Sequence, residues 1–325
     1  MNIEYSRPRP SFWPPAHQID IMRILAPILT LLAALTLGAC NNSPEPANLN
    51  TVKNGTPALW KVTGTQPGQT GVAYMFGTIH ILPDDVQWRT PALEAAIAES
   101  DRLVIEVLGL DDTKGAAKIF SRLAVSPGQE KLETRIRPSL HDDLERIIDS
   151  ANIPERALNR METWAAALSL ASAQTRGLGL NSSSGVEEKL TEQFTKAGKP
   201  IEALETIELQ LGYFDKLPEA QQRQMLTSVV EDSTDAQRDF EELFNAWMTG
   251  DIEQMVTLTD SGILADSTTR KYLLVSRNLD WVEQLDKRLQ KPGTSLVAVG
   301  AAHLAGPDAV QETLAKRGYK IEKIQ

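Results

Sequence analysis

The sequence predicts an α/β fold: a mixed sheet made from two related strand-GxxH-helix-strand units, with a helical insertion between them. The first unit covers residues 72–107 and contains "VAYMFGTIHILPDDV" and "ALEAAIAESDRLVIEV". The second unit covers residues 295–324 and contains "SLVAVGAAHLAGPDAV" and "TLAKRGYKIEKI". Both have the order strand, Gly-x-x-His, aliphatic residue, Pro-Asp, helix and strand, which indicates two copies of one supersecondary unit.

The residues around the first unit support each of its elements. Strand-forming residues at 58–62 and 71–77 flank the turn-rich "TGTQPGQT", which predicts a β-hairpin. The next helix has Thr90 as its N-cap and Pro91 at its first position. Residues 101–107, "DRLVIEV", predict the strand that completes the unit.

The helical insertion covers about residues 112–290. Residues 199–206, "KPIEALET", predict one short strand within it. The segments with helical spacing of apolar residues are 139–151, 161–175, 185–198, 218–233, 239–250 and 281–290. Residues 182–188, "SSSGVEE", could suggest a serine nucleophile, but the pattern is more typical of a helix N-cap followed by acids in the first turn.

Length and charge narrow the class of protein. A chain of 325 residues with 42% hydrophobic residues can form one large domain or two small ones. The net charge of -10 gives no sign of the basic surface that binds phosphate backbones, so we expect no nucleic-acid partner.

The sequence from Met22 onwards has the features of an export signal. A basic residue precedes the uncharged run Ile24–Leu37, which is too short to span a bilayer comfortably. The tetrapeptide "LGAC" that ends at Cys40 resembles the bacterial lipobox, in which the cysteine is diacylated and becomes the mature N-terminus. The alternative is an ordinary secretory signal with an incidental cysteine. Cys40 is the only cysteine in the chain and can form no internal disulfide, which favours its use as a lipid anchor.

These features divide the chain into three predicted parts. Residues 1–40 form an N-terminal extension and lipoprotein signal, with a translation start at Met22. Residues 41–56 are rich in Asn and Pro and predict a flexible tether, and residues 57–325 form the folded domain. We therefore expect an exported domain that reaches a membrane partner through its lipid anchor. Asn41 after the cysteine favours the periplasmic face of the outer membrane.

Two histidines are the first candidate site residues. Residues just past the carboxyl ends of strands line the ligand crevice of an α/β sheet, so turns on neighbouring strands would direct His80 and His303 to one place. Each could instead be a satisfied polar residue that ties a strand end to a nearby carbonyl. His141 lies in the first turn of a helix beside acids and is expected at the surface.

Carboxylates and one arginine complete the candidate set. Glu106 is a charged residue in an otherwise apolar strand, where it is either solvated at an edge or buried with a partner. Glu205 ends the short strand and could equally be a helix-capping acid. Arg277, followed by Asn278, could clamp a substrate carboxylate or neutralise one from the protein.

The quoted strands and turns, together with "GVEEKLTEQFTKAGKPIEALETIELQL" and "VSRNLDW", resemble the TraB/GumN family, which includes the Tiki and PrgY proteins. The resemblance covers about residues 58–325. It implies a mixed α/β core with a helical insertion and, for the Tiki branch, metal-dependent protease activity that uses both histidines and a glutamate.

Carried onto this chain, the resemblance implies that His80, His303 and Glu106 bind the metal and that Glu205 is a second active-site acid. Arg277 and Asn278 would be polar supports.

We therefore expect a metallohydrolase, specifically a peptidase, that uses a divalent Mn, Co or Zn ion. Glu205 would be the general base, and Arg277 would contact the oxyanion or a substrate carboxylate. The sequence has no HExxH helix, G-x-S-x-G elbow or phosphate-binding glycine loop. The alternatives are a non-catalytic lipoprotein that sequesters a peptide, a metal or haem, and a purely structural envelope protein.

Overall fold

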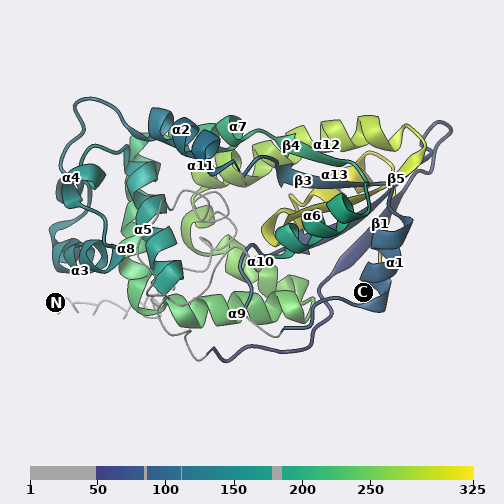
Figure 1. Cartoon of the computed structure of the whole chain (residues 1–325), viewed down its shortest axis with the longest axis horizontal. Helices are drawn as coiled ribbons and strands as arrows, with labels where there is room; N and C mark the ends of the chain where they lie inside the picture. The colour runs from purple at the N-terminus through teal and green to yellow at the C-terminus, as the bar shows by residue number, and fades with distance from the viewer. Residues whose placement is uncertain (1–48, 84–85, 111, 178–184) are drawn as a thin grey trace, which may run out of the picture.

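The computed structural model describes residues 49–325 except 84–85, 111 and 178–184 (Figure 1). The predicted export signal, the start at Met22, the lipidated Cys40 and most of the tether lie outside the described residues. Within the described part of the chain, no helix combines the length and the apolar character that a membrane crossing needs.

One six-stranded sheet organises the domain, with strand order β4-β3-β5-β2-β1-β6. The predicted hairpin is confirmed: β1 (Leu59–Thr63) and β2 (Gly71–Thr78) are antiparallel, with Leu59 opposite Phe76. On its other side, β1 pairs antiparallel with β6 (Lys320–Lys323). Strand β1 therefore runs opposite to the other strands of the sheet.

The parallel part of the sheet brings the two Gly-x-x-His units together. Strand β5 (Gly293–Gly300) lies between β2 and β3 (Arg102–Val107), and β3 pairs in turn with β4 (Ile201–Glu205). Thr78 is the register partner of Gly300, so the two turns leave the sheet side by side. This arrangement confirms that the two Gly-x-x-His turns follow neighbouring strands, β2 and β5.

Alternating side chains of the strands bury both faces of the sheet. Helices α1, α6, α9 and α10 cover one face, where they pack on side chains such as Phe76 and Ile105. Helices α12 and α13 cover the other face, where they pack on Met75 and Val104. The bounds are α1 (Pro91–Glu99), α6 (Val186–Lys196), α9 (Ala236–Met248), α10 (Ile252–Asp260), α12 (Ser276–Leu289) and α13 (Val310–Lys316).

Two features predicted for α1 are present in the structure. The Thr90 side chain accepts a hydrogen bond from the backbone N–H of Leu93 at 3.1 Å, which satisfies one of the free donors at the helix start. Pro91 occupies the first helical position, where its missing N–H costs nothing.

The remaining helices form a lobe at one end of the sheet, on the left in Figure 1. Its core includes residues from Ala116 to Leu274. Within it, the ring centroid of Trp164 lies 5.8 Å from that of Phe120 and 6.2 Å from that of Phe214. The helices are α2 (Thr113–Ala124), α3 (His141–Ala151), α4 (Glu155–Leu158), α5 (Thr163–Gly177), α7 (Ile207–Asp215), α8 (Glu219–Glu231) and α11 (Ser267–Arg270).

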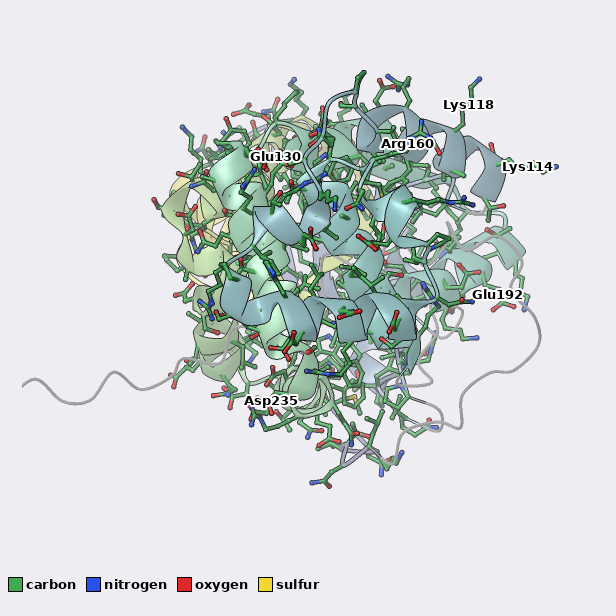
Figure 2. The ribbon with its side chains drawn as sticks, turned by 90° about the vertical axis from the view of Figure 1, so that its left-hand side faces the viewer. Lys114, Lys118, Glu130, Arg160, Glu192 and Asp235 are labelled. Carbon is green, nitrogen blue, oxygen red and sulfur yellow. The ribbon has the colours of Figure 1, made fainter. Side chains whose placement is uncertain are left out.

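Figure 2 looks onto this lobe and shows charged side chains directed outward, among them Lys114, Lys118 and Glu130. The 112–290 segment is thus mostly the helical lobe. It also supplies β4 to the sheet, α6, α9 and α10 to one face and α12 to the other. Residues of the insertion are thereby placed at the carboxyl ends of the strands.

Candidate functional site

The turn after β2 is held against the start of α6. The backbone N–H of Val186 donates to the carbonyl of Ile79 at 3.1 Å. A Cβ atom on Gly185 would clash with the carbonyl oxygen of His80, so only glycine allows the two segments to approach this closely. This contact brings the first turn of α6 directly over His80.

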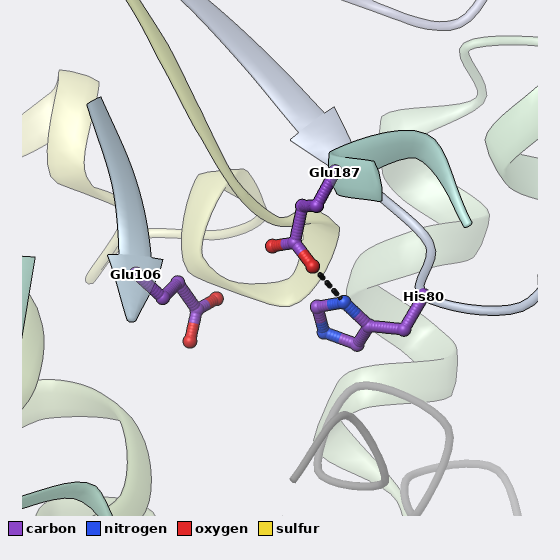
Figure 3. A group of neighbouring side chains, drawn as sticks. All are labelled: His80, Glu106 and Glu187. Atoms are coloured by element: carbon purple, nitrogen blue, oxygen red, sulfur yellow. Dashed lines mark hydrogen bonds and ion pairs between the residues drawn. The ribbon is translucent and has the colours of Figure 1, made fainter. Parts of the chain in front are cut away.

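Glu187 is the acid that this contact delivers to the site. Its carboxylate pairs with Nδ1 of His80 and accepts a hydrogen bond from the Thr78 hydroxyl at 3.1 Å (Figure 3). His80 is 3% exposed, whereas the Glu187 side chain is 16% exposed. The pair therefore lies at the boundary between the protein interior and its surface.

Glu106 points toward this pair from the end of β3 (Figure 3). One donor atom from each of His80, Glu106 and Glu187 lies within 4.8 Å of the other two. Ligands that share one ion at about 2.0–2.2 Å lie at most about 4.4 Å apart, so small side-chain rotations would let all three groups reach one ion. One imidazole and two carboxylates suit Mn, Co or Zn, so the donor set fits the predicted divalent ion.

The carboxylate of Glu106 is held by three further donors. Its Oε1 accepts from the backbone N–H of Gly300 at 2.7 Å. Its Oε2 accepts from Nη2 of Arg277 at 2.7 Å and from Nε2 of Gln210 at 3.1 Å. Burial alone would raise the pKa of Glu106, but the charge of Arg277, the nearby histidines and the Gly300 N–H lower it to about 2. Glu106 is therefore an anion at neutral pH.

Arg277 also binds the second buried acid, Glu205. Its Nε and Nη2 each lie 2.9 Å from an oxygen of Glu205, and the Trp281 indole N–H donates to Glu205 at 2.8 Å. Burial raises the pKa of Glu205, an effect that Arg277 opposes and the charge of Glu106 reinforces. Burial lowers the pKa of Arg277, but the charges of Glu106 and Glu205 raise it by more. The guanidinium therefore stays charged.

His303 is a further buried partner of Arg277. Its Nε2 is 3.1 Å from Nη1 of Arg277, its Nδ1 is 2.5 Å from Oδ1 of Asn278, and its ring centroid is 4.3 Å from that of Trp281. Arginine can only donate, so Nε2 accepts and Nδ1–H donates to Asn278, whose Nδ2 donates to the carbonyl of Asp308 at 2.8 Å. Burial, followed by the charge of Arg277, lowers the pKa of His303 to about 3, which keeps its ring neutral.

Both histidines and Glu106 meet around one glycine. A Cβ atom on Gly300 would lie 3.0 Å from Oε1 of Glu106, 3.7 Å from Cδ2 of His303 and 3.9 Å from Nε2 of His80. The two turns thus direct their histidines to one place, as the register of β2 and β5 requires. Metal ligation by His303 stays a prediction, because in this conformation its ring nitrogens face Arg277 and Asn278.

The sequence pattern does not identify three residues of this network. It predicts Glu187 only as an acid in a helix first turn, where the structure does place it, together with Glu188. Gln210 on α7 and Trp281 on α12 carry no local signal that separates them from ordinary buried residues. All three act through tertiary contacts that the sequence pattern does not specify.

A cavity of about 800 Å³ adjoins the group of His80, Glu106 and Glu187, here called the His80 cluster. His80, Glu106, Glu187 and Gln210 lie along it, together with the residues after β3, including Leu108, which is 42% exposed. Polar residues of α6 such as Glu188 and Thr191 form another part of its wall. The volume is in the range of small-molecule and peptide sites, and the donor atoms of the cluster are at its edge.

The fold and site define an α/β domain with a helical lobe and a buried His/Glu/Arg network at the carboxyl edge of its sheet. The chain belongs to the TraB/PrgY/gumN family, whose sequence model matches residues 58–323.

The relatives among curated proteins carry no assigned function. The chain is 26% identical over 251 residues to the uncharacterized protein YbaP of Shigella flexneri, which covers 77% of this chain and 90% of that protein. It is 25% identical to YbaP of Escherichia coli K12 over 74% of this chain and 87% of that protein. It is 21% identical to an uncharacterized protein of Treponema pallidum over 89% of this chain and 90% of that protein. No solved structure matches the chain.

Proposed function

We propose that this domain is a metal-dependent hydrolase that acts on peptides. The observation that carries the proposal is the group of donor atoms of His80, Glu106 and Glu187, all within 4.8 Å of one another at the edge of the 800 Å³ cavity. A bound divalent ion would supply Lewis acidity for the activation of water and of a substrate carbonyl.

The protein's own residues would hold this donor set in the right ionisation state. Arg277 and the Gly300 N–H keep Glu106 anionic and fix its orientation. Glu187 pairs with Nδ1 of His80 and so restrains the orientation of the imidazole ring. His303, whose ring is held by Asn278, contacts Nη1 of Arg277.

The contacts also bear on the roles proposed for Glu205 and Arg277. Glu205 as a general base is supported by its raised pKa, but both its oxygens are bound by Arg277 and Trp281. The contacts fit better with Glu205 as a positioning residue that holds Arg277. Arg277 would in turn reach a substrate oxyanion only by releasing one of its carboxylates.

The peptide specificity rests on the family resemblance and on the cavity. A volume of about 800 Å³ with apolar and polar walls can take several residues of an extended chain. We further propose that residues 1–40 export the domain and that Cys40 anchors it to the outer membrane on the periplasmic side, as the lipobox-like sequence suggests.

The proposal is tested with a protein that begins at residue 41, loaded with Mn, Co or Zn and incubated with a mixture of defined peptides. We expect cleavage that stops with chelator and in Glu187→Gln, while Glu188→Gln, the neighbouring acid in the same cavity wall, retains it. Saturable peptide binding without cleavage would point instead to a sequestering lipoprotein.

A further inference from the structure

A second cavity, of about 370 Å³, lies at the opposite edge of the sheet. It is lined where β3, β4 and β5 begin, at Arg102, Glu202 and Ser295, and by the last turn of α12 and the residues after it. Arg102 is four residues before Glu106 on β3, which separates the two cavities by roughly 13 Å along that strand.

The lining of this cavity is strongly basic. Arg102, Lys287, Arg288 and Lys291 face it, against one carboxylate, Glu202. The surplus is three positive charges, 4 minus 1, in a protein whose net charge is -10. Concentration of like charge in one hollow is unfavourable unless an anion offsets it.

The single carboxylate is already shared between two arginines. Glu202 accepts from Nη1 of Arg102 at 3.0 Å, and its other oxygen pairs with Nη1 of Arg288. Lys287 and Lys291 form no ion pair with any carboxylate of the described residues, and both are exposed. Asp101 lies close by and accepts a hydrogen bond from the backbone N–H of Thr294 at 2.7 Å. If its negative charge is counted as well, the surplus of positive charge is still two, 4 minus 2.

Stabilisation of a helix end explains only part of this arrangement. Lys287 and Arg288 lie in the last turn of α12, where cations compensate the partial negative charge of the helix terminus. Arg102 belongs to a strand, so the macrodipole of α12 gives no reason for it to join the lysines and Arg288. Gly293, with φ of +123°, also borders the cavity without a side chain.

We propose that this basic cavity binds a phosphate group, as the monoester of a soluble molecule or as a lipid headgroup. Guanidinium groups match the paired oxygens of a phosphate, and the two lysines add mobile point charges at the rim. The cavity has the volume of a small ligand site, and it shares no residue with the group His80, Glu106 and Glu187. The site is therefore independent of the proposed hydrolase function.

The test is calorimetric titration of inorganic phosphate and pyrophosphate into the protein at low ionic strength in chloride buffer. We compare Lys287→Glu/Lys291→Glu with Lys114→Glu/Lys118→Glu, which makes the same charge change on exposed lysines of α2 (Figure 2). We expect binding at least about tenfold weaker in the first variant, about 1.4 kcal/mol, and within about twofold of wild type in the second. Circular dichroism melting confirms that both variants fold.

Absence of phosphate and pyrophosphate binding by the wild-type protein, or equal loss in both double variants, would overturn the proposal. A second arm separates the two sources of phosphate. Phosphatidylcholine vesicles with and without phosphatidic acid are sedimented with the protein. Capture that needs phosphatidic acid and is lost only in Lys287→Glu/Lys291→Glu assigns a lipid headgroup. Phosphate binding without such capture assigns a soluble phosphorylated molecule.

Discussion

The Nη2 atom of Arg277 lies 2.7 Å from Oε2 of Glu106, and both side chains are buried. The same guanidinium binds Glu205 through two atoms, so one cation compensates two acids in the interior. A buried charge that loses its partner is strongly destabilising. Arg277 is thus the residue on which the ionisation state of the whole network depends.

Replacement of Arg277 by methionine is expected to lower the free energy of unfolding by about 3–5 kcal/mol, because Glu106 and Glu205 would remain buried without their cation. Urea denaturation followed by tryptophan fluorescence measures this change. Arg317→Met is the matched control, because Arg317 pairs with Glu283 in an exposed ion pair and its loss should cost about 1 kcal/mol or less. Similar losses in the two variants would show that the network does not depend on Arg277.

Gly185→Ala is expected to lower the affinity for metal more than it lowers the free energy of unfolding. The new methyl group would push against the carbonyl of His80 and move the first turn of α6, which carries Glu187. Isothermal titration with Mn measures the affinity. Gly212→Ala on α7 is the control, because its new methyl group would meet no neighbouring atom within 4 Å. Alanine also stabilises a helix by up to about 1 kcal/mol relative to glycine. An unchanged Mn affinity in Gly185→Ala would argue against Glu187 as a ligand.

Trp164→Ala is expected to destabilise the helical lobe by about 3–5 kcal/mol, because Trp164 is fully buried between Phe120 and Phe214. Hydrogen exchange measured by mass spectrometry should show faster exchange in α5 and α8 than in the strands. Leu279→Ala, at a position 48% exposed, should change exchange little. Equal acceleration in sheet and lobe would indicate that the two unfold as one unit.

Removal of bound metal is expected to lower the melting temperature. A ligand that binds only the folded state adds stability in proportion to RT ln(1 + [L]/Kd), so chelator should destabilise Mn-loaded protein. The His80→Ala variant should melt at one temperature with and without chelator. A chelator effect of equal size in His80→Ala would place the ion elsewhere.

Much of the fold follows from local pattern. The hairpin, the Thr90–Pro91 helix start and the strands 102–107 and 201–205 can be predicted because strand periodicity, capping residues and turns are encoded by neighbouring residues. The pairing of β2 with β5 follows from the repeated unit. The position of α6 over the sheet does not, because it depends on the contact of Gly185 with His80, which are 105 residues apart.

The candidate site could likewise be predicted only in part from the sequence. The sequence points to His80, Glu106, His303, Glu205, Arg277 and Asn278, and the structure brings them into one network. Their individual roles could not be predicted, because which atom faces which partner depends on side-chain packing. Glu187 has the same local context as Glu188, and the sequence pattern does not show that Glu187 pairs with His80.

A metal centre at His80, Glu106 and Glu187 is tested most directly by the metal content of purified protein after Mn, Co or Zn loading and desalting, measured by elemental mass spectrometry. We expect about one equivalent of ion for wild type and for Glu188→Gln, and a loss of most of it in His80→Ala and in Glu187→Gln. Negligible metal in the wild-type protein, or equal metal in all four, would contradict a metal centre at His80, Glu106 and Glu187.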